Sequence, residues 1–319
     1  MHNLKKTLTL KAGYLLFSNG IRSVANIVVY MLLSRSLSQH DYGNYRLIWL
    51  FITILSLIFV FGLPGSITYF VAGRPHKEQQ KYFGQTMSLL AVSSLVQIVL
   101  LYLFRNSIAS YFNNPEIAHY ILISLPVFML YPYTHIYSPA LVAKGHVKSS
   151  AAINIAYSML FVVGVAGVAY ATKSIFSTLV AFDIILVVYT IVAFIMLFSR
   201  FKNAPLSFNL ESIKAQARYA LPLGAALSLE LVSKFVDKII VGSFVSTSEY
   251  SIYANGSFEL PFVGMISGAV MAILFPEFVK YFKNNEISKI IRIWKESIGR
   301  TGIIVIPVMV YFYAYANEI

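Results

Sequence analysis

Three polar residues, Asn19, Arg22 and Asn26, interrupt an apolar stretch near the N-terminus. They are three and four positions apart, so a helix carries all three on one face. Inserting an ionised side chain at the centre of a bilayer costs about 2.5–3.5 kcal/mol, so such a residue usually has a functional or structural role. Arg22 has no acid on its own helix and lies about 11 residues, roughly 15 Å, from either end of the stretch. Its guanidinium could snorkel to the headgroups, but we favour a role in binding a substrate, together with Asn19 and Asn26 on the same face.

A second polar stripe, consisting of Glu230, Lys234, Asp237 and Lys238, crosses another apolar stretch. Its spacing again places the four side chains on one helix face. These charges could simply pair with one another, because Glu230 and Lys234 are a favourable i,i+4 pair and a lysine could neutralise Asp237. We favour lining of a water-filled cavity, in which Lys234 and Lys238 are candidate substrate-binding residues.

Two further acids, Asp183 and Glu259, also lie in apolar stretches. Together with Glu230 and Asp237 they are candidates to carry a coupling H⁺ or Na⁺. The alternative for Asp183 and Glu259 is a polar group near a helix end that faces the lipid headgroups.

Catalytic and metal-binding patterns are absent from the sequence. It contains no phosphate-binding loop, no HExxH and no GxSxG motif. There is no cysteine, and His135 has no second ligand at a suitable spacing, so we expect no metal site and no cofactor. His135 lies in a tyrosine-rich segment, 126–139, whose aromatic rings could stack on sugars or form an interfacial belt. We expect a protein that is not an enzyme.

The elements that position these residues are membrane helices. Hydrophobic residues make up 58% of the chain and charged residues 12%, whereas soluble domains have about 25% charged residues. A span needs about 20 apolar residues. By this measure we predict an all-α polytopic membrane protein with about nine transmembrane helices, at 12–33, 46–71, 83–104, 117–140, 150–171, 176–198, 219–243, 253–276 and 299–317. We expect helix breaks at 62–65 and at 222–224, where glycine and proline come together.

The positive charges predict the orientation. Most Lys and Arg residues fall in alternate connections, on the same side as the N-terminus, and only Arg35, Arg46, Arg105 and Lys173 fall on the other side. Because cytoplasmic loops are enriched in Lys and Arg, we expect the N-terminus to be cytoplasmic. The net charge of +12 is explained in this way and does not indicate a nucleic-acid partner.

An internal repeat relates the two ends of the chain. Residues 37–45 (LSQHDYGNY) return as residues 245–253 (VSTSEYSIY), 208 positions later. The same offset superposes the first three spans on the last three and aligns Arg22 with Glu230. We therefore expect a parallel repeat in which the two polar stripes meet between two helix bundles. Within 37–45 we expect an outer loop with a tight turn at Gly43 and interfacial tyrosines.

The repeat also predicts the domain organisation. We expect an N-terminal six-helix lobe at 1–200, a cytoplasmic linker at 201–218 and a partial C-terminal lobe of three helices at 219–319. A second lobe equal to the first would need about 90–100 more residues. We therefore expect the chain to be a C-terminally truncated form of a longer transporter, with an odd nine-helix protein as the alternative.

Several short motifs resemble those of bacterial polysaccharide-export flippases. The similar residues are Leu37-Ser38 followed by Tyr42-Gly43-Asn44-Tyr45, Gly62-Leu63, Asp237 to Gly242, and Phe275-Pro276. This family belongs to one superfamily with lipid II flippases and multidrug/toxin extruders. The resemblance implies two six-helix lobes around a cationic cavity, with Arg22, Lys234 and Lys238 as its basic groups.

The resemblance implies a flippase for a polyprenyl-diphosphate-linked oligosaccharide of the O-antigen or capsule type, in the bacterial inner (plasma) membrane. Its partners would be the bilayer, the glycolipid and the polysaccharide polymerase and chain-length proteins. A cation-coupled multidrug extruder of the same fold is the alternative, and a membrane polysaccharide polymerase or ligase is a more distant one.

Overall fold

The computed structural model describes residues 2–201, 209–257 and 284–315, together with residues 274, 278 and 281. Over these residues the chain is helical and contains no strand. The chain divides into two compact units, Met1–Gly256 and Ser257–Ile319. The predicted boundaries at residues 200 and 218 remain a prediction.

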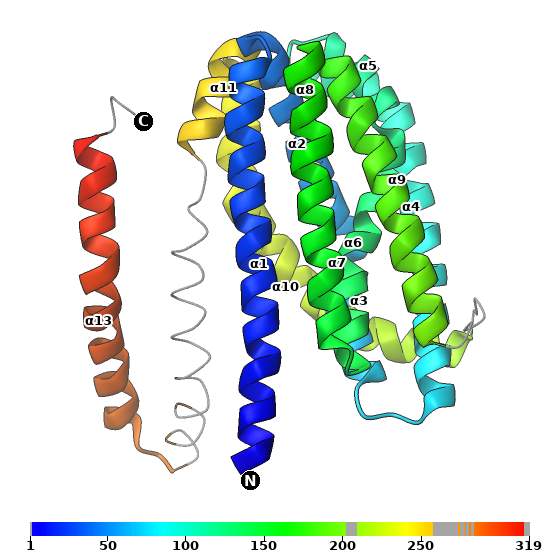
Figure 1. The fold of residues 1–319 in the computed structure, drawn as a ribbon, viewed down its shortest axis with the longest axis vertical. Helices are drawn as coiled ribbons and strands as arrows, with labels where there is room; N and C mark the ends of the chain where they lie inside the picture. The colour runs from blue at the N-terminus through cyan, green and yellow to red at the C-terminus, as the bar shows by residue number, and fades with distance from the viewer. Residues whose placement is uncertain are drawn as a thin grey trace. The chain divides into compact units, whose positions relative to one another are not determined.

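The first unit is a bundle of long helices with several breaks (Figure 1). Its elements are α1 (His2–Ser36), α2 (Gln39–Val60), α3 (Leu63–Val71), α4 (His76–Tyr111), α5 (Glu116–Ile123), α6 (Leu125–Ala143), α7 (Val147–Leu160), the π-helical turn η1 (Phe161–Ala166), α8 (Gly167–Thr172), α9 (Ile175–Arg200), α10 (Leu210–Phe244) and α11 (Thr247–Gly256). In the second unit, α13 (Ile287–Ala314) covers most of the predicted last span at 299–317.

The helices confirm an all-α polytopic membrane protein. Six are long and apolar enough to cross a bilayer: Gly13–Ser36, Gln39–Val60, His76–Tyr111, Val147–Thr172, Ile175–Arg200 and Ile287–Ala314. Two bent pairs raise the number to as many as eight, namely α5 with α6, bent by 58°, and the two parts of α10, bent by 45°. Most of the predicted span at 253–276 lies outside the described residues.

One of the two predicted helix breaks is confirmed. Between α2 and α3, Phe61 and Gly62 both have left-handed backbone angles, with φ of 38° and 74°. Gly62 also allows the Ala220 carbonyl of α10 to approach, since a Cβ there would lie 2.3 Å from that oxygen. The predicted break at 222–224 is wrong, because α10 continues through Pro222 and bends between Leu231 and Ser233 instead.

The core of the first unit lies around α6, which contacts α2, α3, α4, α7 and α9. Large aromatic side chains fill it, and Phe83, Phe128, Tyr137, Phe161 and Phe182 are all fully buried. Apolar side chains such as Val96, Leu103, Ile191 and Ile195 remain exposed along α4 and α9. Such side chains suit contact with lipid tails, so close packing rather than exclusion of water holds these helices together.

Both copies of the repeat begin a helix in the same way. The Ser38 hydroxyl accepts a hydrogen bond from the Asp41 backbone N–H (3.1 Å) at the start of α2. The Ser246 hydroxyl accepts one from the Glu249 N–H (3.3 Å) at the start of α11, and the Glu249 carboxylate accepts one from the Ser246 N–H (2.9 Å). The predicted loop is therefore mostly helix. The predicted turn at Gly43 is wrong, because Gly43 lies inside α2.

Candidate functional site

Arg22 lies on the buried side of α1, which packs against α7 and η1. Its guanidinium carbon is 5.6 Å from the centre of the Tyr157 ring, within the range of a cation–π contact. It also interacts with Tyr131 on α6 and Tyr189 on α9, so aromatic groups from three helices surround it. Within the described residues no carboxylate forms an ion pair with Arg22.

Several buried polar atoms lie near this arginine. The hydroxyl of Tyr157 and the Nε2 atom of His135 make no hydrogen bond within the described part of the chain. The ring of His135 stands edge-on to Tyr131 at 5.6 Å. Buried polar groups are normally paired, so a cation and unsatisfied donors and acceptors together are suited to an anionic or hydroxylated ligand. The other two residues of the predicted stripe differ in exposure: Asn19 is exposed and Asn26 is half-buried.

The charges of α10 pair mainly with one another. Lys234 binds Glu230 (2.8 Å) and Lys238 binds Asp237 (3.2 Å). The hydroxyl of Tyr253 donates a further hydrogen bond to Asp237 (2.8 Å). The side chains of Lys234 and Glu230 are 47% and 56% exposed, so this pair is hydrated or lipid-facing rather than a core ion pair. The structure therefore does not bring Arg22 together with Glu230, as the repeat alignment had suggested.

Asp183 has a structural partner. It is buried on α9, and its Oδ1 atom accepts a hydrogen bond from the Val127 backbone N–H (3.2 Å). Val127 lies in the first turn of α6, where backbone N–H groups lack partners within the helix. Asp183 thereby stabilises the restart of the helix after the 58° bend. Glu259 lies outside the described residues.

Sequence reasoning missed the role of Arg46, which it placed in an exposed connection. Arg46 is 7% exposed and donates hydrogen bonds to the Ala254 carbonyl (2.5 Å), the Asn255 side-chain oxygen (3.4 Å) and the Tyr42 hydroxyl (3.3 Å). The available signal was the repeat itself, because Ala254 is 208 positions after Arg46. Tyr42 and Tyr45, expected at the interface, are both buried in the core.

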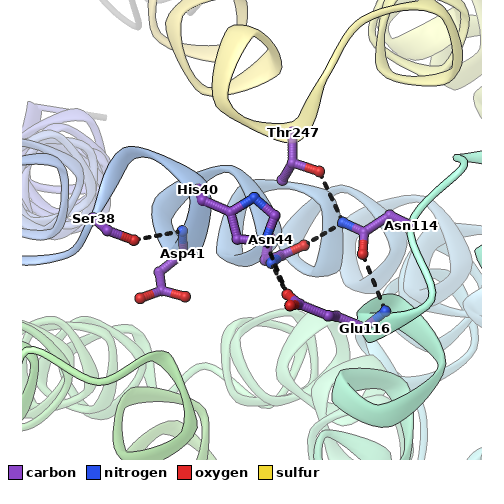
Figure 2. A network of polar contacts seen from close by, with 7 residues as sticks. All are labelled: Ser38, His40, Asp41, Asn44, Asn114, Glu116 and Thr247. Atoms are coloured by element: carbon purple, nitrogen blue, oxygen red, sulfur yellow. Dashed lines mark hydrogen bonds and ion pairs between the residues drawn. The ribbon is translucent and has the colours of Figure 1, made fainter.

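Arg46 forms part of a larger polar contact between the two repeats, which we call the seam. On one side it consists of Tyr42, Gly43 and Arg46 of α2 with Asn113 and Asn114 after α4. On the other side it consists of Ser243, Thr247, Ala254 and Asn255 of α10 and α11. Figure 2 shows Asn114 at its edge, between Asn44 and Thr247.

The fold and the site together define a polytopic α-helical membrane protein with an arginine that no carboxylate neutralises within the described residues. The chain belongs to the polysaccharide biosynthesis protein family, whose family model matches residues 8–282. Neither the curated proteins nor the solved structures that were compared gave a match. This family and the membrane-helical fold fit a transporter rather than an enzyme.

Proposed function

We propose that the protein is a flippase that carries a polyprenyl-diphosphate-linked oligosaccharide across the inner membrane by alternating access. The observation that supports this most is Arg22, a cation inside a membrane bundle with aromatic neighbours and no carboxylate partner in the described part of the chain. The polysaccharide biosynthesis family supplies the substrate class. An O-antigen or capsule repeat unit has the required chemistry, which is a diphosphate, sugars and a lipid tail.

In this proposal the lipid tail stays in the bilayer while the diphosphate moves to Arg22. The guanidinium can bind a phosphate through two parallel hydrogen bonds. Tyr131 and Tyr157 offer ring faces and hydroxyls of the kind that bind sugars. Lys234 and Lys238 serve as additional cations after exchanging their acidic partners for the substrate.

The release of those acids offers a route to coupling. When a phosphate binds the lysines instead, Glu230 and Asp237 lose their lysine partners, while Tyr253 still donates to Asp237. Both carboxylates can then bind H⁺ or Na⁺. Asp183 and Glu259 are further candidates by position in the sequence, although Asp183 also has its helix-starting role. The orientation in this proposal is N-terminus cytoplasmic, with the polysaccharide polymerase and chain-length proteins as partners on the product side.

The test uses a strain that lacks this gene and carries variants in its place. Loss of charge-assisted hydrogen bonds of about 1.5–3 kcal/mol predicts at least a tenfold lower flipping rate for Arg22→Ala. Arg22→Lys keeps the charge but cannot form two parallel hydrogen bonds, so its flipping rate should lie between those of the wild type and Arg22→Ala. Arg35→Ala, an exposed arginine at the end of the same helix, is the matched control.

Surface glycan and carrier-linked glycan are measured together with the amount of each variant in the membrane. The expected result is less surface glycan and more carrier-linked intermediate for Arg22→Ala at normal membrane abundance. Normal surface glycan in that strain would remove Arg22 from the mechanism. Unchanged glycan in the deletion strain with raised drug sensitivity would instead favour a multidrug extruder.

A further inference from the structure

Three neighbouring polar residues near the middle of α4, Ser93, Ser94 and Gln97, form what we call the α4 patch. Ser94 and Gln97 are both 0% exposed and lie within the candidate membrane span His76–Tyr111. Neither the Ser94 hydroxyl nor the two polar atoms of the Gln97 amide form a hydrogen bond within the described residues. Buried polar groups are normally paired, and inside a bilayer no bulk water can replace the missing partner. The α4 patch is therefore a candidate binding site.

The α4 patch lies against the last turn of α2. The Ser93 hydroxyl donates a hydrogen bond to the Phe59 carbonyl (2.5 Å), one residue before α2 ends at Val60. Carbonyls in the last turn of a helix have no N–H partner within that helix. The Val60 carbonyl cannot pair with the residue four positions later either, because Pro64 has no N–H. The interruption between α2 and α3 thus leaves backbone oxygens beside the α4 patch.

Oxygen atoms that can accept or coordinate are more numerous here than donors. Ser93 donates its proton to Phe59, so its own oxygen is left as an acceptor. Gln97 is three residues after Ser94 and four after Ser93, so its amide can reach both hydroxyls on the helix surface. The last carbonyls of α2 add the partial negative charge of a helix C-terminus. Such a set of neutral oxygens suits a cation rather than an anion.

The neighbouring sequence determines which kind of cation fits. Residues 52–66 and 86–101, the parts of α2, α3 and α4 around the patch, contain no Asp, Glu or His. No side chain there can carry a coupling proton, and no carboxylate is present for a divalent cation, which prefers such ligands. Backbone carbonyls at the ends of interrupted membrane helices coordinate sodium in other transporters. A monovalent cation, sodium, therefore fits this chemistry best.

We propose that the α4 patch and the last carbonyls of α2 bind a sodium ion, with the Gln97 amide oxygen and the Ser94 hydroxyl as side-chain ligands. The proposal goes beyond the flippase function and does not depend on it, because the site uses none of the residues assigned to the substrate or to the coupling acids. The ion joins α4 to α2 beside the interruption of the second span. Its binding should therefore stabilise the first unit.

The test is the thermal unfolding midpoint of the purified chain in detergent, measured at equal ionic strength in sodium, potassium or choline chloride. A ligand that binds only the folded state raises the midpoint by mass action. Sodium in about tenfold excess over its dissociation constant should raise the midpoint by roughly 2–5 °C relative to choline. Equal midpoints in sodium and choline would overturn the proposal, and so would a larger rise in potassium than in sodium.

Two variants locate the ion. Gln97→Leu removes the amide at similar size, and it should abolish the difference between the midpoints in sodium and in choline. Ser94→Ala removes one ligand and should reduce that difference. A difference of wild-type size in both variants would place the ion elsewhere and overturn the site. In choline, Gln97→Leu should unfold no lower than the wild type, because the unpaired amide costs stability when no ion is bound.

Matched controls come from the same helix. Gln85 is a buried glutamine that pairs with Gln216, and Ser88 is a buried serine that donates to the Gly84 carbonyl (3.0 Å). Gln85→Leu and Ser88→Ala should change the midpoint equally in every salt and keep the full difference between sodium and choline. Loss of that difference in the controls as well would overturn the assignment to Gln97. Transport is not measured, so failure of the flippase function leaves this test unaffected.

Discussion

Replacing Gly43 by alanine is expected to open the seam, although alanine is the better helix former. Gly43 lies inside α2, and a Cβ at this position would stand 2.0 Å from the carbonyl oxygen of Thr247 and 2.8 Å from its carbonyl carbon. Both atoms belong to the backbone and cannot rotate away. Because Cβ contacts closer than 3.0 Å essentially do not occur, α2 and α11 must separate by about 1 Å.

The magnitude follows from three contributions. Overpacking of this kind costs about 1–3 kcal/mol. A separation of about 1 Å also stretches the 2.8 Å hydrogen bond between Asn114 and Thr247, for a further 0.5–1.5 kcal/mol or so. Replacing glycine by alanine in a helix interior stabilises the helix by up to about 1 kcal/mol, which offsets part of these losses. Together these contributions destabilise the seam by about 0.5–4.5 kcal/mol. A value of about 2 kcal/mol within that range corresponds to a roughly 30-fold shift toward a separated seam.

The assay is the rate at which Ala254→Cys reacts with a membrane-impermeant thiol reagent, with and without Gly43→Ala, because Ala254 is only 1% exposed while the seam is in contact. Gly20→Ala in α1 is the matched control, because its Cβ would have no neighbour within 4 Å. The rate should rise at least about twofold for Gly43→Ala and stay constant for Gly20→Ala. If Gly43→Ala leaves the rate unchanged, α2 and α11 are not in the contact that the structure shows.

Four further outcomes are expected. Gly62→Ala should lower the midpoint of thermal unfolding more than Gly73→Ala, because both have positive φ but only Gly62 would meet a backbone atom, the Ala220 oxygen at 2.3 Å; equal losses would leave only the backbone strain of about 1–2 kcal/mol. Ser38→Ala should cost about 1 kcal/mol of unfolding free energy through the lost cap of α2, and an unchanged denaturation midpoint would contradict this. The hydrogen bonds from Ser246 hold the pKa of Glu249 below its ordinary value of 4.5. The stability that these bonds add is therefore present above about pH 4.5 and is lost as the pH falls through the lowered pKa. Glu249→Gln should abolish this part of the pH dependence of the unfolding midpoint. A double-mutant cycle between Glu230 and Lys234 should give a coupling below about 1 kcal/mol that shrinks with added salt, since both side chains are about half exposed, whereas a larger, salt-independent value would place the pair in a dry environment.

The fold was largely predictable because a bilayer limits the choices. A span must be apolar over about 20 residues and satisfy its own backbone, so segment length and charge position determine most of the topology. What the sequence obscured was local helix geometry. Ser38 and Asp41 have the spacing of a helix start, yet the same residues read as a loop because Gly43 follows them. Pro222 shows the opposite error, since α10 accommodates it without a break.

The sequence indicated which residue types the candidate site contains, but not which side chains contact one another there. A role of Asn19, Arg22 and Asn26 in binding stays a prediction. Spacing placed them on one face of α1, where Asn19 is exposed and the other two are half-buried. It could not show that the facing groups are Tyr131, Tyr157 and Tyr189 rather than the charges of α10, because that depends on which helices pack together. Arg46 was obscured for a related reason. A charge near a span end is typical of a headgroup or loop residue, and the sequence does not show that α11 and the ring of Tyr30 pack over it.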